Sequence, residues 1–121
     1  MKMTGEPLHF ATAERWRTWL ERNHASKEDA WLLISKKHAK TPSVTLQEAM
    51  REAICFGWID SSLQPIDSER YALRFTPRRP TSNWSERNKG WAAELIEQGR
   101  MTPAGLAKIE DAKRNGRWDP A

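Results

Sequence analysis

The amino-acid sequence predicts a single α+β domain over residues 1–121, in which about four helices pack a small, mostly antiparallel sheet of one strand and a hairpin. Two observations predict the sheet. One short apolar run has the length of a buried strand, and two alternating segments separated by a short polar stretch are typical of a hairpin. The helices are predicted by four stretches that carry helical spacing or helix-start signals.

The first helix is predicted to run from Thr12, a suitable N-cap, to near Asn23. Its apolar residues fall three or four positions apart and form one stripe: Phe10, Ala13, Trp16 and Leu20. The run AWLLI at residues 30–34 is continuous, apolar and too short for a typical helix. We therefore predict a strand that is buried on both faces.

The second helix has the strongest start signal in the chain. Thr45 and Glu48 have the spacing of a capping box, in which each side chain accepts a hydrogen bond from the other residue's backbone N–H. The predicted apolar face of this helix consists of Leu46, Ala49, Met50, Ala53 and Ile54. Gly57 stands where a helix-terminating glycine belongs. The loop before the helix is basic and contains Lys36, Lys37, His38 and Lys40.

Residues 58–66 and 70–76 are predicted to pair as a hairpin with a three-residue loop. This loop places Leu73 opposite Leu63, and it keeps the apolar face whole because opposite residues point to the same side. The predicted core face holds Ile59, Leu63, Leu73 and Phe75. The other face then holds Trp58, Asp60, Ser62, Arg74 and Thr76, and extends to Arg78.

Two helices are predicted after the hairpin. Ser82 or Asn83 is predicted to cap a third helix, which runs to residue 98 before Gly99. Thr102 and Pro103 stand in the cap-then-proline order that starts a helix, and this fourth helix is predicted to end at residue 116.

Composition and charge narrow the classes of function. The net charge of +4 and the pI near 9.5 permit anionic partners, but positive and negative charges alternate along most of the chain. The sequence has no basic block and no nucleic-acid-binding motif, so we do not expect nucleic acid to be the partner. No apolar run approaches the roughly 20 residues of a membrane span, and no secretory signal is visible, so a cytoplasmic location is expected.

Metal and cofactor chemistry is not indicated by the sequence. The three histidines have no ligand spacing, the single cysteine has no partner, and no phosphate-binding glycine loop occurs. We therefore expect neither a metal nor a cofactor. The one cysteine, Cys55, excludes a disulfide within the chain and is typical of a reducing compartment.

The best candidate site is the second face of the hairpin, with Trp58, Asp60, Arg74 and Thr76, which Arg78 and Trp84 join from the following segment. Aromatic planes and guanidinium groups suit a ligand that has a flat part and an anionic part, or a peptide terminus. The alternative interpretation is structural: Asp60 and Arg74 form an ion pair, and the tryptophans fill the core.

Two residues could make the protein an enzyme. Asp60 would act as a general base in a pocket shared with Arg74, although neighbouring arginines would keep its carboxylate ionised and weakly basic. Cys55 would act as a nucleophile, although it follows an apolar helix and faces the unfavourable end of the helix dipole. We therefore assign no catalytic residue, and we keep an enzyme and a nucleic-acid-binding protein as alternatives to a ligand-binding domain.

Several motifs in one order resemble the YdeI/OmpD-associated family, whose members are also labelled bacteriocin-protection proteins. The motifs are WLERNH at 19–24, PSVT at 42–45, CFGWID at 55–60, RFTPR at 74–78, SNWS at 82–85 and GRMTPAG at 99–105. The resemblance extends from about Phe10 to Trp118 and implies a binding domain in stress or bacteriocin protection. It points to seven positions as the site: Trp58, Asp60, Arg74, Thr76, Arg78, Trp84 and Ser85. It also implies a further basic helical segment, which the chain is expected to lack because it stops at Ala121.

Overall fold

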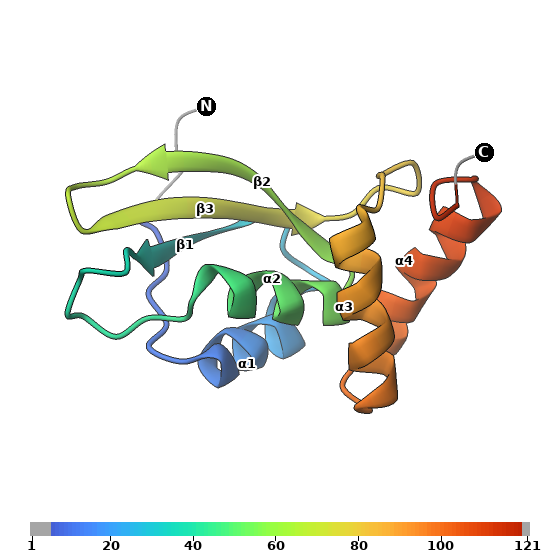
Figure 1. The fold of residues 1–121 in the computed structure, drawn as a ribbon, viewed down its shortest axis with the longest axis horizontal. Helices are drawn as coiled ribbons and strands as arrows, with labels where there is room; N and C mark the ends of the chain where they lie inside the picture. The colour runs from blue at the N-terminus through green and yellow to red at the C-terminus, as the bar shows by residue number, and fades with distance from the viewer. Residues whose placement is uncertain (1–5, 120–121) are drawn as a thin grey trace.

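The computed structural model describes residues 6–119 and has the predicted α+β fold. The elements follow the predicted order: α1 (Ala13–Asn23), β1 (Ala30–Ser35), α2 (Leu46–Cys55), β2 (Trp58–Pro65), β3 (Arg70–Pro77), α3 (Glu86–Glu97) and α4 (Pro103–Arg114). The three strands form an antiparallel sheet in the order β1-β3-β2. Figure 1 shows α1 and α2 beneath this sheet and α3 and α4 together at one end of it. None of the helices within residues 6–119 is long and apolar enough to cross a membrane.

Local side-chain chemistry explains where the helices begin. The capping box before α2 is present in full, because the Thr45 hydroxyl accepts from the Glu48 N–H and the Glu48 carboxylate accepts from the Thr45 N–H. Thr12 caps α1 and Thr102 caps α4, as predicted. The predicted cap of α3 at residue 82 or 83 is wrong. Ser85 caps this helix, with its Oγ accepting from the Asn88 N–H at 3.1 Å.

The core lies between the sheet and helices α1 and α2, and it is rich in aromatic rings. Trp16, Trp58 and Phe75 are the largest fully buried side chains. Trp16 lies 5.4 Å from Phe75 between ring centroids, and its indole N–H donates to the Ala49 carbonyl at 3.0 Å. Residues 30–34 of β1 are all buried, which confirms the strand predicted to be covered on both faces.

The predicted register of the hairpin is confirmed from Leu63 to the turn, but the predicted faces are wrong for the first residues of β2. Leu63 pairs with Leu73 as predicted, and Asp60 pairs with Phe75, so β2 has one more residue than β3 between these two pairs. Such a bulge moves every residue before it to the opposite face. Asp60 therefore shares a face with Phe75, and Ile59, which pairs with Thr76, lies on the face of Arg74.

Two residues predicted for the core are exposed instead. Leu63 is 59% exposed on β2, one of the two edge strands of the sheet, although its partner Leu73 is buried. Leu46, the first residue of α2, is 42% exposed. The rest of the predicted α2 face is buried, namely Ala49, Met50, Ala53 and Ile54.

Candidate functional site

The seven residues predicted as one site lie in separate places. Trp58 is part of the core, where its ring meets the edge of Trp19 with centroids 5.9 Å apart. The structure places Arg74 and Thr76 on the other side of the sheet, in a shallow pocket of 560 Å³. Arg74 donates through Nε to Asp29 Oδ2 at 3.0 Å, so the ion pair between Asp60 and Arg74, which was the alternative interpretation, is wrong.

Arg78 and Trp84 do lie together, in a buried contact. The Arg78 guanidinium lies 3.7 Å from the centroid of the Trp84 ring, and its Nη1 donates to the Asn83 carbonyl at 3.1 Å. Only 2% of Arg78 is exposed, and within residues 6–119 its Nε and Nη2 have no hydrogen-bond partner. Burial lowers the pKa of Arg78 to about 10, and the nearby Asp60 carboxylate partly opposes this shift. The Ser85 hydroxyl serves as the N-cap of α3, where it accepts a hydrogen bond from the Asn88 N–H.

A larger pocket of 870 Å³ opens between the ends of β1 and β3, the start of α2, and α3. We call it the main pocket. Its apolar lining consists of Ile34, Leu46, Met50, Tyr71 and Trp91, and its cationic lining of Lys36, Lys37 and Arg87. The remaining lining residues carry hydroxyl or amide groups: Ser35, Thr41, Ser43, Thr45 and Gln47. No aspartate, glutamate, histidine or cysteine is among the lining residues.

The fold explains how this lining is assembled. Ile34 pairs with Tyr71 across β1 and β3, so both side chains point to the same side of the sheet. Arg87 and Trp91 are four residues apart on α3 and so share one face of that helix. Burial raises the pKa of the Tyr71 hydroxyl, which therefore stays protonated and neutral around pH 7.

Arg87 is held in place by packing and is not paired with a carboxylate. Its guanidinium lies 4.8 Å from the centroid of the Trp91 ring, and its Nη2 approaches Met50 Sδ at 4.0 Å. No carboxylate of the described chain lies within salt-bridge distance of it. Arg51 also approaches Trp91, at 5.9 Å, but it is paired with Glu94 at 2.9 Å. Arg87 therefore presents an oriented, uncompensated cation to the main pocket.

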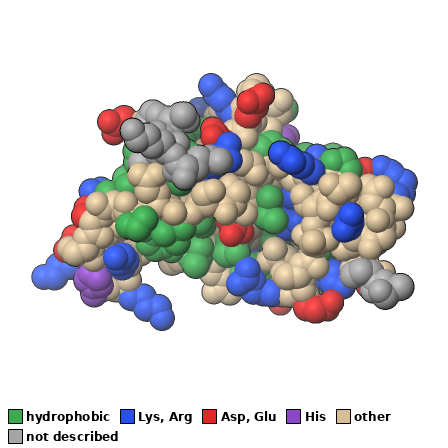
Figure 2. All heavy atoms as spheres, turned by 90° about the horizontal axis from the view of Figure 1, so that it is seen from above, with side chains coloured by type: hydrophobic (Ala, Val, Ile, Leu, Met, Phe, Trp, Pro, Cys, Tyr) green, Lys and Arg blue, Asp and Glu red, His purple; other side chains and the backbone are tan. Residues whose placement is uncertain are grey.

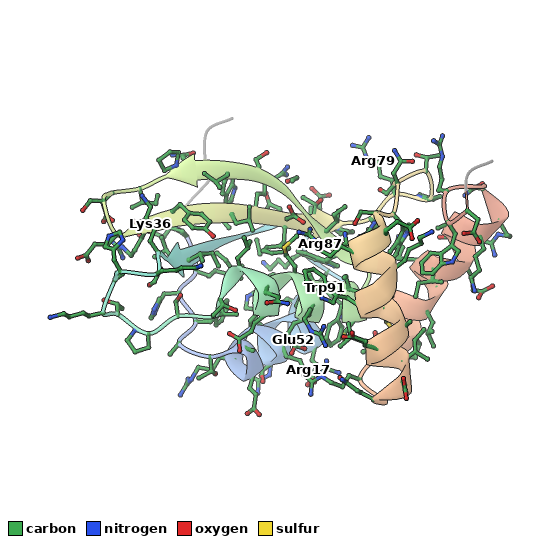
Figure 3. All side chains as sticks on the ribbon, viewed as in Figure 1. Arg17, Lys36, Glu52, Arg79, Arg87 and Trp91 are labelled. Carbon is green, nitrogen blue, oxygen red and sulfur yellow. The ribbon has the colours of Figure 1, made fainter. Side chains whose placement is uncertain are left out.

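The other cations of the main pocket come from the end of β1. The backbone N–H of Lys36 donates to the Glu69 carbonyl at 2.8 Å, which fixes the start of the basic loop against the hairpin tip. The Lys36 ammonium lies 3.5 Å from the Asp67 carbonyl oxygen, and no carboxylate of residues 6–119 pairs with Lys36 or Lys37. Figure 3 shows Lys36 near the outer end of the sheet and Arg87 and Trp91 beside α3. At that outer end, Figure 2 shows Lys or Arg and His side chains beside a hydrophobic area.

A buried charge cluster lies apart from this pocket. The Glu52 carboxylate accepts from Arg17 Nη1 at 2.9 Å and from Arg100 Nη2 at 2.7 Å, and Arg17 also donates to the Arg100 carbonyl. These bonds join α1, α2 and the connection between α3 and α4. Because the charges compensate one another, we interpret the cluster as structural.

Cys55 is fully buried beside this cluster. Burial raises the pKa of its thiol, and the neighbouring Arg17 guanidinium opposes that shift only in part. The neutral, inaccessible thiol is unsuited to act as a nucleophile. No group of three or more metal-ligating side chains gathers among residues 6–119.

Sequence reasoning missed the main pocket although parts of it were visible. The basic loop and the helix that contains Trp91 were both predicted, but nothing in the local sequence indicated that they meet. Their meeting depends on how α3 packs against α2, which brings Arg87 to Met50.

A comparison with protein-family models matches residues 8–108 to a family described as a domain of unknown function, DUF8412. No curated protein and no solved structure matches the chain.

Proposed function

The chain belongs to the DUF8412 family of domains of unknown function, and we propose that it binds a small amphipathic anion in the main pocket. The ligand has a flat or apolar body, which rests on Met50, Tyr71 and Trp91, and an anionic group, which Arg87 binds. The observation that carries this proposal is the lining itself, which combines an apolar surface with three cations and no carboxylate.

The physical chemistry of the lining supports this class of ligand. The pocket volume of 870 Å³ is in the range of small-molecule sites. An apolar body gains affinity by removing water from the aromatic and aliphatic floor. A guanidinium offers two parallel N–H donors to a carboxylate or phosphate. Because the Arg87 side chain is already held against Trp91, it loses less conformational entropy when it binds a ligand.

The same lining favours binding over catalysis. The residues that line the main pocket include no histidine, cysteine or carboxylate, which are the usual general bases and nucleophiles. Tyr71 is the only titratable group of the lining besides the cations, and its raised pKa makes it a poor base near neutral pH. A role in stress or bacteriocin protection is what the resemblance to YdeI/OmpD-associated proteins implies, and it stays a prediction.

Isothermal titration with naphthalene-2-carboxylate tests the proposal, because this probe combines a flat apolar body with one carboxylate. We expect Arg87→Gln to weaken binding by about tenfold or more, since it removes a charge-assisted pair of hydrogen bonds. Arg79→Gln is the matched control, because Arg79 lines the smaller pocket and not the main one. Thermal melting of both variants checks that the fold is intact.

Two results would overturn the proposal. The first is the absence of binding by the wild-type protein at millimolar probe concentrations. The second is a reversed pattern, in which Arg79→Gln loses binding and Arg87→Gln keeps it, because the smaller pocket that contains Arg74 and Thr76 would then be the site.

A further inference from the structure

We infer that the ligand of the main pocket carries two anionic groups, one at each end of its apolar body. This inference rests on the proposed function and adds the class of ligand. It arises from the positions of the cations, which stand at two ends of the pocket and not in one cluster.

The two ends are built by different parts of the chain. Arg87 belongs to α3 and contacts Met50 and Trp91. Lys36 and Lys37 follow the last residue of β1, and the backbone of Lys36 is bonded to the hairpin tip at Glu69. Figure 3 shows this separation, with Lys36 near the outer end of the sheet and Arg87 beside α3. We therefore assign a separate anionic group to each end.

The surface between the two ends is apolar. Ile34 and Tyr71 lie side by side on the sheet, and Leu46 and Met50 are one helical turn apart on α2. Four residues of helix rise by roughly 6 Å, so a ligand that follows this surface needs a rigid or extended apolar spacer of at least that length. A naphthalene ring that carries one acidic group at each of its two far ends has such a rigid apolar spacer.

The second anionic group is expected to contribute less than the first. Lys36 and Lys37 are exposed, so the ammonium groups keep much of their hydration when they meet an anion. Arg87 is exposed as well, but its guanidinium is already held against the Trp91 ring and close to Met50 Sδ. We therefore expect the second group to raise affinity by about five- to tenfold, in a way that weakens as salt is added.

The test compares naphthalene-2-carboxylate with naphthalene-2,6-dicarboxylate, which have the same body and differ by one carboxylate. Isothermal titration of the wild-type protein is expected to give about five- to tenfold tighter binding of the dicarboxylate. The double variant Lys36→Gln/Lys37→Gln is expected to bind the two probes equally. The control Lys40→Gln/Arg79→Gln removes the same charge from residues that do not line the main pocket, and it should keep the preference.

The outcomes separate this inference from the proposed function. If the wild-type protein binds both probes equally, the two-headed ligand is wrong and binding of a single anion stands. A preference that survives in Lys36→Gln/Lys37→Gln, or that disappears in the control, overturns the assignment of the second group to these lysines. If neither probe binds, the inference falls together with the proposed function.

Discussion

Replacing Glu52 by glutamine is predicted to lower the free energy of unfolding by about 2–3 kcal/mol. The Glu52 side chain is only 9% exposed, and its two oxygens accept hydrogen bonds from Arg17 and Arg100. Glutamine keeps one acceptor oxygen, but its amide N–H groups then face a guanidinium that is also a donor. The variant therefore loses a charged hydrogen bond. It leaves Arg100 without a carboxylate partner among the described residues, and Arg17 with only the exposed Glu21 at 3.5 Å.

The magnitude follows from the burial of the partners. Removing one member of a fully buried ion pair costs about 3–5 kcal/mol, and losing one hydrogen bond to a charged group costs about 1.5–3 kcal/mol. The side chains of Arg17 and Arg100 are 20% and 42% exposed, so both can turn partly toward water after the substitution. We therefore place the expected loss below the range for a fully buried ion pair and within the range for a hydrogen bond to a charged group, at about 2–3 kcal/mol.

Urea unfolding at pH 7 measures this loss, and the chain offers a matched control. Glu94 also pairs with an arginine, Arg51, at 2.9 Å, but its side chain is 58% exposed. Glu94→Gln should cost no more than about 1 kcal/mol, and added salt should reduce that cost further. With a urea m-value of about 2 kcal/mol per molar, Glu52→Gln lowers the unfolding midpoint by about 1 M or slightly more. Equal midpoint shifts for the two variants would refute the reasoning that burial sets the cost.

Further predictions concern the packing of α2 against α4, with a glycine of α3 for comparison, and the buried thiol. A Cβ added at Gly105 would lie 2.5 Å from the Cys55 carbonyl oxygen and 2.5 Å from Met101 Sδ, so Gly105→Ala should cost about 1–3 kcal/mol in urea unfolding. Gly90 lies within α3 and has open space around it, so Gly90→Ala should raise the free energy of unfolding by about 0.5–1 kcal/mol. A Gly90→Ala variant that is less stable, or a Gly105→Ala variant that is more stable, would contradict the packing. Burial keeps the Cys55 thiol protonated and covered. Its reaction with an aromatic disulfide reagent at pH 8 should therefore be at least about tenfold slower in the folded protein than in urea. Equal rates would show that the thiol is accessible.

Much of the fold could be predicted because the signals were local. The capping box at Thr45 and Glu48 involves only neighbouring residues, and α2 begins where these side chains place it. The apolar run of β1 identified a strand by its length alone. The pairing of Leu63 with Leu73 followed from keeping the apolar residues of the hairpin on one face, which requires a three-residue loop.

The candidate site could not be predicted because the sequence around its residues does not show how the structure brings them together. The bulge between Asp60 and Leu63 has no marker in the sequence, and it moved Trp58 and Asp60 away from the face of Arg74. The start of α3 at Ser85 was missed because Ser82 is also a serine, a residue type preferred at helix N-caps. In the structure, Ser82 does not cap the helix and accepts a hydrogen bond from the Arg79 N–H. The main pocket required the packing of α3 against α2, which periodicity within one helix does not reveal.

The most direct test of the central claim is an NMR titration of the ¹⁵N-labelled wild-type protein with naphthalene-2-carboxylate. The account predicts that shift changes concentrate on the residues that line the main pocket, including the backbone amides of Lys36, Leu46 and Tyr71 and the indole N–H of Trp91. Changes that concentrate around Arg74 and Thr76, or a spectrum that stays unchanged at millimolar probe, would contradict it.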